Sequence, residues 1–270
     1  MKLKAILIAP VLILPFLYNC AFEPYDVNTR FEESSKLSTP TDVAIADTNN
    51  FSFVHVTDIH VENGVNNKLS SMSDHLIGSD EFIVISGDLV DTGKRSDTIA
   101  YRDIMDNLGL PYYSAPGNHD FWNNGWDGFK DVLGPSVYTA VVGDLLIIVL
   151  DSADDTLGSL QYAWLEKQLK QRTEKYCIVV SHYNLHSPTM FESAQSTNME
   201  EVYGMMRLFK RHDVDYVVMG HTHIFDYRKI DGVSYLVGDE LKKYSSNGTK
   251  YYNRITVTNG LFSHEKIPIK

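Results

Sequence analysis

Short apolar runs rich in β-branched residues recur from residue 51 onward, and a polar loop follows each run. Six of these runs predict buried strands, at residues 51–57, 81–86, 112–115, 144–150, 175–181 and 215–219. Between several of them the apolar positions have helical spacing, which predicts helices at residues 66–78, 97–108, 159–172 and 198–212. In the third helix, one face is suggested by Gln161, Trp164, Leu165 and Leu169. Strands that alternate with helices indicate an α/β fold.

The C-terminal stretch has a different pattern. Asn259-Gly260 stands between two β-like runs, and this dipeptide is a strong signal for a hairpin. Together with the run at residues 232–237, the hairpin suggests antiparallel strands that close a second sheet. We find no internal period of about 20–50 residues, so a solenoid is not indicated.

The first 20 residues have the pattern of an export signal. Lys2 and Lys4 precede an almost wholly apolar run at residues 5–18. This run is shorter than the roughly 20 residues of a membrane-spanning helix, and Pro10 and Pro15 would interrupt a helix. Residues 1–20 therefore predict a signal for export and not a spanning helix.

The end of this signal resembles that of a bacterial lipoprotein. An apolar residue, Leu17, stands three positions before Cys20, although Tyr18 and Asn19 replace the usual small residues. We expect an exported protein, either a bacterial cell-envelope lipoprotein held to the membrane by a lipid on Cys20, in the periplasm or on the outer surface, or a secreted protein. An uncleaved anchor is the remaining alternative.

Composition and charge limit the class of protein and the binding partners that the sequence allows. A chain of 270 residues with 43% hydrophobic residues can bury the core of one domain. Residues 21–50 are polar without sustained periodicity, which predicts a tether or the lead-in to that domain. The formal charge of −11 disfavours non-specific nucleic-acid binding. Cys20 and Cys177 form no CxxC pair, so neither a thiolate zinc site nor a disulfide framework is indicated, and we expect Cys177 to be buried.

Polar clusters follow five of the predicted strands. They are Asp58-Ile59-His60, Gly87-Asp88-Leu89-Val90-Asp91, Gly117-Asn118-His119-Asp120, Ser181-His182 and Gly220-His221-Thr222-His223. Catalytic groups of α/β sheets gather beyond the carboxyl ends of the strands, so these clusters could converge on one crevice. Imidazole and carboxylate ligands suit transition metals, and two ions roughly 3.5–4 Å apart can hold both oxygens of a phosphoryl transfer.

The ordered series of clusters resembles the calcineurin-like metallophosphoesterase family. The motifs span residues 58–223, and the strand pattern extends the resemblance to residues 51–270. The resemblance implies an α/β fold in which helices flank a two-sheet β sandwich, with residues 51–270 as the catalytic domain. It also implies two divalent or mixed-valence transition metal ions, of Mn, Fe or Zn, with a hydroxide between them that attacks phosphorus.

Carried over position by position, the resemblance implies a role for each residue. The first ion would be held by Asp58, His60, Asp88 and His223. The second would be held by Asp88, Asn118, His182 and His221, with Asp88 as the bridge. His119 would protonate the leaving oxygen or stabilise its charge, and Asp91 would orient His119. Asp120 belongs to the same motif and is the third catalytic candidate, with a less definite role. Taken singly, such Asp and Asn residues are more often helix caps or turn residues, but the complete ordered set would require a coincidence at every position.

Departures from the family pattern narrow the subfamily. Purple acid phosphatases carry a metal-binding Tyr where this chain has Asp91. Protein Ser/Thr phosphatases carry a phosphate-binding Arg at the position of Thr92, and a Glu at the position of Asp120. The chain is more similar to the cyclic-nucleotide phosphodiesterase-like branch, which does not define a substrate.

Other residues near the clusters have two interpretations each. Phe121, Trp122 and Trp126 could form an aromatic wall that stacks a base, but we favour packing of the loop. His186 could reach the substrate or have a structural role, and Arg95 could meet phosphate or lie in solvent.

These observations predict a metal-dependent phosphoesterase that hydrolyses a small phosphodiester or phosphomonoester. A nuclease of the same fold is the nearest alternative, but it would need a basic groove that this acidic chain does not indicate. A surface binding protein that retains the fold without turnover is the alternative from another class. It is disfavoured because every ligand position and His119 are present.

Overall fold

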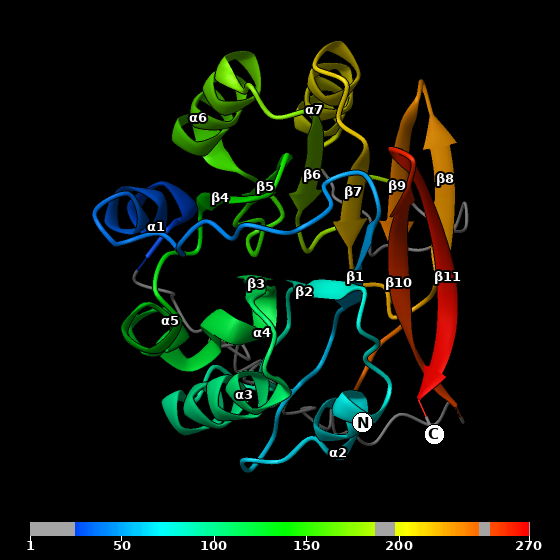
Figure 1. Ribbon diagram of the computed structural model, residues 1–270. Coiled ribbons are helices and arrows are strands. Elements are labelled where there is room, and N and C mark those ends of the chain that lie inside the picture. The colour runs from blue at the N-terminus through cyan, green and yellow to red at the C-terminus, as the bar shows by residue number, and fades with distance from the viewer. Residues whose placement is uncertain (1–24, 187–197, 243–248, 270) are drawn as a thin grey trace, which may run out of the picture.

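Two β-sheets lie face to face in the computed structural model, which describes residues 25–186, 198–242 and 249–269 (Figure 1). The strands are β1 (Phe51–Val56), β2 (Asp80–Ser86), β3 (Tyr112–Ala115), β4 (Tyr138–Val142), β5 (Leu145–Val149), β6 (Tyr176–Val180), β7 (Tyr216–Met219), β8 (Asp226–Ile230), β9 (Val233–Val237), β10 (Lys250–Thr258) and β11 (Leu261–Ile269). One sheet has the order β11-β10-β1-β2-β3, and the other has the order β4-β5-β6-β7-β9-β8.

Helices cover both outer faces of this sandwich (Figure 1). They are α1 (Val27–Ser34), α2 (Asn67–Ser70), α3 (Arg95–Leu108), α4 (Asn118–Phe121), α5 (Gly125–Leu133), α6 (Gly158–Gln171) and α7 (Met199–Arg211), with short 3-10 turns η1 (Ser71–Asp74) and η2 (Trp122–Asn124). The helices α3 and α5 lie against the sheet that contains β1, and α6 and α7 lie against the other sheet. The predicted α/β fold, a two-sheet sandwich flanked by helices, is therefore confirmed.

The core consists of three apolar layers, one between the sheets and one under each set of helices. Phe53 stacks on Phe82 between the sheets, with ring centroids 4.7 Å apart. Because both faces of each sheet are covered, central strands such as β5 and β6 are buried at every position. This is why they stand out in the sequence as continuous apolar runs. The thiol of Cys177 in β6 is buried as expected, and burial raises its pKa to about 12.

Most predicted elements lie within two residues of their observed bounds. The helix predicted at 97–108 is α3, which ends at Gly109 because this glycine takes a left-handed φ of 76°. The helix predicted at 66–78 is wrong, since only α2 and η1 form there. The hydroxyl groups of Ser70 and Ser71 donate to main-chain carbonyls within this segment, a local bonding that competes with regular helix.

The C-terminal hairpin is confirmed, but its predicted sheet partner is wrong. Strands β10 and β11 pair antiparallel around Asn259 and Gly260, both with positive φ, as a tight hairpin turn requires. The hairpin then pairs with β1, whereas residues 233–237 form β9 in the other sheet, parallel to β7. The missed partner of β9 is β8, an edge strand whose sequence DYRKI is too polar to stand out.

The described part of residues 21–50 packs on the sandwich. Helix α1 begins at the capping residue Asp26 and lies against α6. Its Arg30 is fully buried, and Nε donates to Asp151 Oδ2 at 2.8 Å. The signal and the lipid site predicted at residues 1–20 lie outside the described residues. Among the residues that the structure describes, no helix combines the length and the apolar character needed to cross a membrane.

Candidate metal centre

The predicted metal ligands meet at one edge of the sandwich, where loops from both sheets converge. The sheet that contains β1 supplies ligands from the ends of β1, β2 and β3, which are Asp58, His60, Asp88 and Asn118. The other sheet supplies ligands from the ends of β6 and β7, which are His182, His221 and His223. Parallel strands place their carboxyl ends at the same edge, so residues more than 160 positions apart in sequence become neighbours.

Four of these side chains form one group. The ligand atoms of Asp58, His60, Asp88 and His223 all lie within 4.8 Å of one another. Within the group, His223 Nε2 lies 3.2 Å from Asp58 Oδ1, and His60 Nε2 lies 3.5 Å from Asp88 Oδ2. These are the four residues that the family resemblance assigns to the first ion.

The second set of ligands gathers around His182. His182 Nε2 lies 3.4 Å from Asp88 Oδ1, 3.3 Å from Asn118 Oδ1 and 3.2 Å from His221 Nδ1. Asp88 therefore directs Oδ1 toward this set and Oδ2 toward His60, which is the arrangement that a bridging carboxylate requires.

The donor set fits metal ions. His60 is buried, and neither of its ring nitrogens has a hydrogen-bond partner. A buried polar atom without a partner is costly, and coordination of an ion would satisfy Nε2. His182 Nδ1 lies 2.8 Å from the carbonyl oxygen of Ser86, which only accepts, so Nδ1 carries a hydrogen and Nε2 is the nitrogen that would bind an ion.

Burial and neighbouring charges shift the pKa values of the ligands at the centre. Burial raises the pKa of Asp88, but His182, His60 and His119 outweigh this effect and hold the pKa well below its ordinary value. Burial lowers the pKa of His60 to about 4 and that of His221 to about 4, so both are neutral near pH 7 and can act as ligands. Asp88 overcomes the effect of burial at His182 and raises its pKa to about 9. Entry of a metal must therefore displace a proton from His182.

The main chain around the ligands is strained. Five ligand residues have left-handed φ values between 49° and 70°, namely Asp58, His60, Asp88, His221 and His223. Each such non-glycine residue costs on the order of 1–3 kcal/mol, and such residues cluster at functional sites. The loops also approach one another closely, since a Cβ on Gly87 would lie 2.4 Å from His182 Nδ1 and a Cβ on Gly117 would lie 2.2 Å from Asp88 Oδ1.

His119 borders the two sets of ligands. Its main-chain N–H donates to Asp88 Oδ1 at 2.9 Å, and its Nδ1 donates to the main-chain carbonyl of Asp91 at 2.7 Å. Nε2 then faces the centre, 3.9 Å from Asp88 Oδ2. Asp91 thus contacts His119 through its main-chain carbonyl and not through its carboxylate. The carboxylate instead lies 3.3 Å from His60 Nδ1 and 2.6 Å from Lys242 Nζ.

Asp120 has a different position from the one expected of a catalytic group. Its Oδ1 accepts from the Val90 N–H at 2.9 Å, and its Oδ2 accepts from the Gly117 N–H at 2.7 Å. The buried carboxylate therefore joins the two loops that carry Asp88 and Asn118. We assign Asp120 a positioning role in place of the catalytic role expected from the motif.

Two charged residues at the centre were not predicted. Glu240 Oε2 lies 3.0 Å from His223 Nδ1 and so orients this ligand, while Lys250 pairs with Glu240. Lys242 pairs with Asp91, as described above. Glu240 follows β9 in the sequence Gly238-Asp239-Glu240, so the rule of polar clusters at strand ends could have found it. Lys242 lies in no such pattern.

The remaining candidates separate into core and surface. Phe121 and Trp126 are buried and pack the loop, whereas Trp122 is 43% exposed and its ring centroid lies 3.7 Å from that of His119. Arg95 pairs with the exposed Asp131 on the surface. His186 is nearly buried, with Nδ1 3.4 Å from Asp226 Oδ2.

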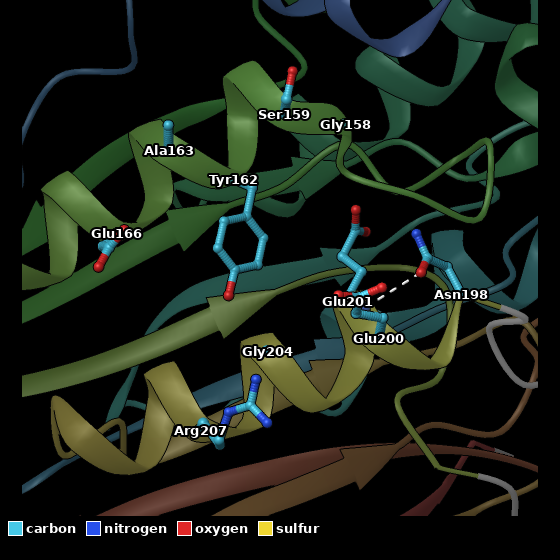
Figure 2. A pocket seen from close by; sticks show the side chains of 10 residues that line it. All are labelled: Gly158, Ser159, Tyr162, Ala163, Glu166, Asn198, Glu200, Glu201, Gly204 and Arg207. Atoms are coloured by element: carbon cyan, nitrogen blue, oxygen red, sulfur yellow. Dashed lines mark hydrogen bonds between the residues drawn. The ribbon is translucent and has the colours of Figure 1, made fainter.

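A separate hollow of about 520 Å³ lies between α6 and α7 (Figure 2). Tyr162 and Glu166 line it from α6, and Glu200 and Arg207 line it from α7. None of its lining residues is a candidate metal ligand. A recess of about 160 Å³ adjoins His223 and is lined by Glu240 and residues of β10 and β11, which makes it part of the metal centre's surroundings.

The part of the chain that carries the candidate metal ligands resembles known proteins. Residues 51–225 match the model of the calcineurin-like phosphoesterase family. A probable glycerophosphodiester phosphodiesterase GpdQ of Arcobacter nitrofigilis is 28% identical over 116 residues, which cover 38% of this chain and 41% of the relative. The chain thus spans about two fifths of the length of this relative.

Solved structures share the fold. The purple acid phosphatase PPD1 of yellow lupin (Lupinus luteus) superposes with a TM-score of 0.65 at 16% identity, over 82% of this chain and 52% of that chain. GAP50, the anchor in the inner membrane complex of Plasmodium, superposes with a TM-score of 0.61 at 14% identity, over 83% and 90% of the two chains. At these identities the likeness shows the fold alone.

Proposed function

The chain belongs to the calcineurin-like phosphoesterase family, and on this basis we propose that it is a metal-dependent hydrolase of phosphate esters. The observation that carries the proposal is the group of Asp58, His60, Asp88 and His223, joined through Asp88 to the set around His182. Two transition metal ions bound there, of Mn, Fe or Zn, would polarise the phosphoryl group and lower the pKa of water.

His119 is the proton donor to the departing alcohol in this proposal. The Asp91 carbonyl accepts from Nδ1 and so keeps the imidazole in one orientation, with Nε2 toward the centre. Trp122 lies against one side of the ring, and His60 approaches it edge-on with centroids 4.5 Å apart. A general acid held in this way contributes about 10²–10⁴-fold to the rate.

We propose a small phosphodiester as the substrate class, with a phosphomonoester as the alternative. The relative from Arcobacter nitrofigilis, a probable glycerophosphodiester phosphodiesterase, supports the diester. The acidic charge of −11 argues against a nuclease. The retention of His119 and of every expected ligand argues against a binding protein without turnover. We also propose that the protein is exported, on the evidence of the signal-like residues 1–20.

The proposal is tested by hydrolysis of bis-p-nitrophenyl phosphate and p-nitrophenyl phosphate. Metal-stripped protein is reloaded with Mn, Fe or Zn, and metal content is measured in parallel. We expect metal-dependent turnover that favours the diester. We also expect His119→Ala to lower kcat while the metal content stays unchanged, with His212→Ala at the end of α7 as the matched control. Protein that binds two ions but hydrolyses no ester with any of the three metals would contradict the proposal.

A further inference from the structure

One large aromatic side chain at the centre remains in solvent. Phe121 and Trp126, on either side of it in sequence, are each 1% exposed, whereas Trp122 is 43% exposed. The loop therefore buries two of its three aromatic residues and leaves the third beside His119. A single exposed apolar side chain is common on protein surfaces and means little by itself, so the way in which Trp122 is held decides its interpretation.

Trp122 is held firmly although it is exposed. Its ring lies 3.7 Å from the imidazole of His119, with an angle of 32° between the planes. A Cβ on Gly93 would come within 2.1 Å of the Trp122 carbonyl oxygen, so the main chain at this position is tightly packed. Asn123 and Asn124 follow in consecutive left-handed conformations, and the Asn123 side chain donates to the Thr92 carbonyl at 3.0 Å. Left-handed non-glycine residues are unfavourable and persist where the surroundings enforce them.

We propose that Trp122 is a specificity-determining residue, the stacking surface for the alcohol that leaves phosphorus. This inference rests on the proposed function, in which His119 Nε2 protonates that alcohol. The leaving oxygen must come within roughly 2.6–3.2 Å of Nε2, and the indole lies against the same imidazole. The carbon group attached to that oxygen therefore comes next to Trp122. A flat aromatic group stacks on an indole better than an alkyl group does, so the favoured substrates carry an aromatic ring on the leaving side.

The alternative is that Trp122 serves only to hold His119 in place. The two roles give different results when the leaving group is varied. A holding role affects proton donation, and so it changes kcat by the same factor for leaving groups of equal acidity. A stacking surface changes the preference between a small and a large flat group, mainly through KM.

The experiment compares methyl phenyl phosphate with methyl 2-naphthyl phosphate, because phenol and 2-naphthol have similar acidity but differ in flat area. We expect the metal-loaded wild type to prefer the naphthyl ester by roughly 2- to 10-fold in kcat/KM, the range of one aromatic stacking contact. Trp122→Leu should abolish this preference, and Trp122→Phe should retain part of it. Tyr203→Leu, which removes an exposed aromatic residue on α7, is the control and should change nothing.

An unchanged naphthyl-to-phenyl ratio in Trp122→Leu, with kcat lowered equally for both esters, would overturn the inference. Calorimetric binding of the same two esters to metal-loaded protein reads the stacking without turnover. If the wild type hydrolyses neither ester, the proposal of a diester substrate fails. A naphthyl preference in binding that Trp122→Leu abolishes would still support the stacking surface, and equal binding of the two esters would overturn it.

Discussion

Replacement of Gly117 by alanine tests whether the approach of the loops, and not only the identity of the ligands, builds the metal centre. Gly117 precedes Asn118 and has φ −114°, a conformation that alanine adopts without strain. The added Cβ would nevertheless lie 2.2 Å from Asp88 Oδ1 and 2.4 Å from the Asp88 main-chain nitrogen. The effect of the substitution is therefore steric and is directed at the carboxylate that faces both sets of ligands.

The size of the effect follows from these distances. An ordinary contact of a Cβ with such atoms begins near 3.4 Å, so the contact at 2.4 Å requires the loops to separate by about 1 Å. A displacement of about 1 Å at a catalytic centre can cost about 100-fold in rate, which corresponds to about 2.7 kcal/mol. We expect Gly117→Ala to lower kcat/KM by about this factor and to bind metal more weakly.

The assay measures metal content after dialysis and hydrolysis of bis-p-nitrophenyl phosphate, with circular dichroism to verify folding. Gly78→Ala is the matched control, because a Cβ on Gly78 would meet no atom within 4 Å. A folded Gly117→Ala protein with wild-type kcat/KM and full metal content would refute the reasoning. It would mean that the loop relaxes without moving Asp88.

Three further predictions concern charge. Glu240→Gln weakens the acceptor that orients His223 Nδ1 at 3.0 Å, so metal affinity measured by competition with a chelator should fall about 10-fold or more; unchanged affinity would show that Glu240 pairs with Lys250 alone. Burial lowers the pKa of His55 to about 3, so below pH 6.5 the unfolded chain binds a proton that the folded protein excludes. The free energy of unfolding therefore has its full value above pH 6.5 and decreases as the pH falls toward 3. Between pH 7 and pH 5, the free energy of unfolding of the metal-free wild type, measured in urea, should fall by about 2 kcal/mol more than that of His55→Gln. An equal fall in the two proteins would contradict this. Lys242→Met removes a partly exposed ion pair with Asp91, worth about 1 kcal/mol or less, so kcat/KM should fall no more than about fivefold; a loss of 100-fold would indicate that Lys242 contacts the substrate.

The strands and the ligand positions were predictable because they follow one rule, in which a buried strand ends at a polar loop. The apolar run before Asp58 and the run before His221 are both fully buried strands, β1 and β7. The edge strand β8 was not predictable, since its sequence DYRKI has no continuous apolar face. The sheet to which β9 belongs was not predictable either, because it depends on strand pairing that sequence spacing does not encode.

The supporting residues were less predictable than the ligands. Arg30 lies in a segment without periodicity, yet it is fully buried, pairs with Asp151 and Asp154, and lies 4.4 Å over the Phe121 ring. Nothing in its local sequence indicates this, because Asp151, Asp154 and Phe121 are all more than 90 positions away. Asp120 shows the reverse case, since a motif position suggested chemistry and the side chain instead joins two loops.

Because the ligands come from both sheets, bound metal should affect how well the protein resists proteolysis. Ions held between Asp88 on one side and His182 or His223 on the other would cross-link the two halves of the sandwich. Loss of the ions would leave this edge of the sandwich held only by direct contacts, such as those of His182 with the Ser86 carbonyl and of the His221 N–H with Asp58. Resistance to proteases should then depend on the metal supply, and a shortage of metal would cause degradation of the protein as well as loss of its activity.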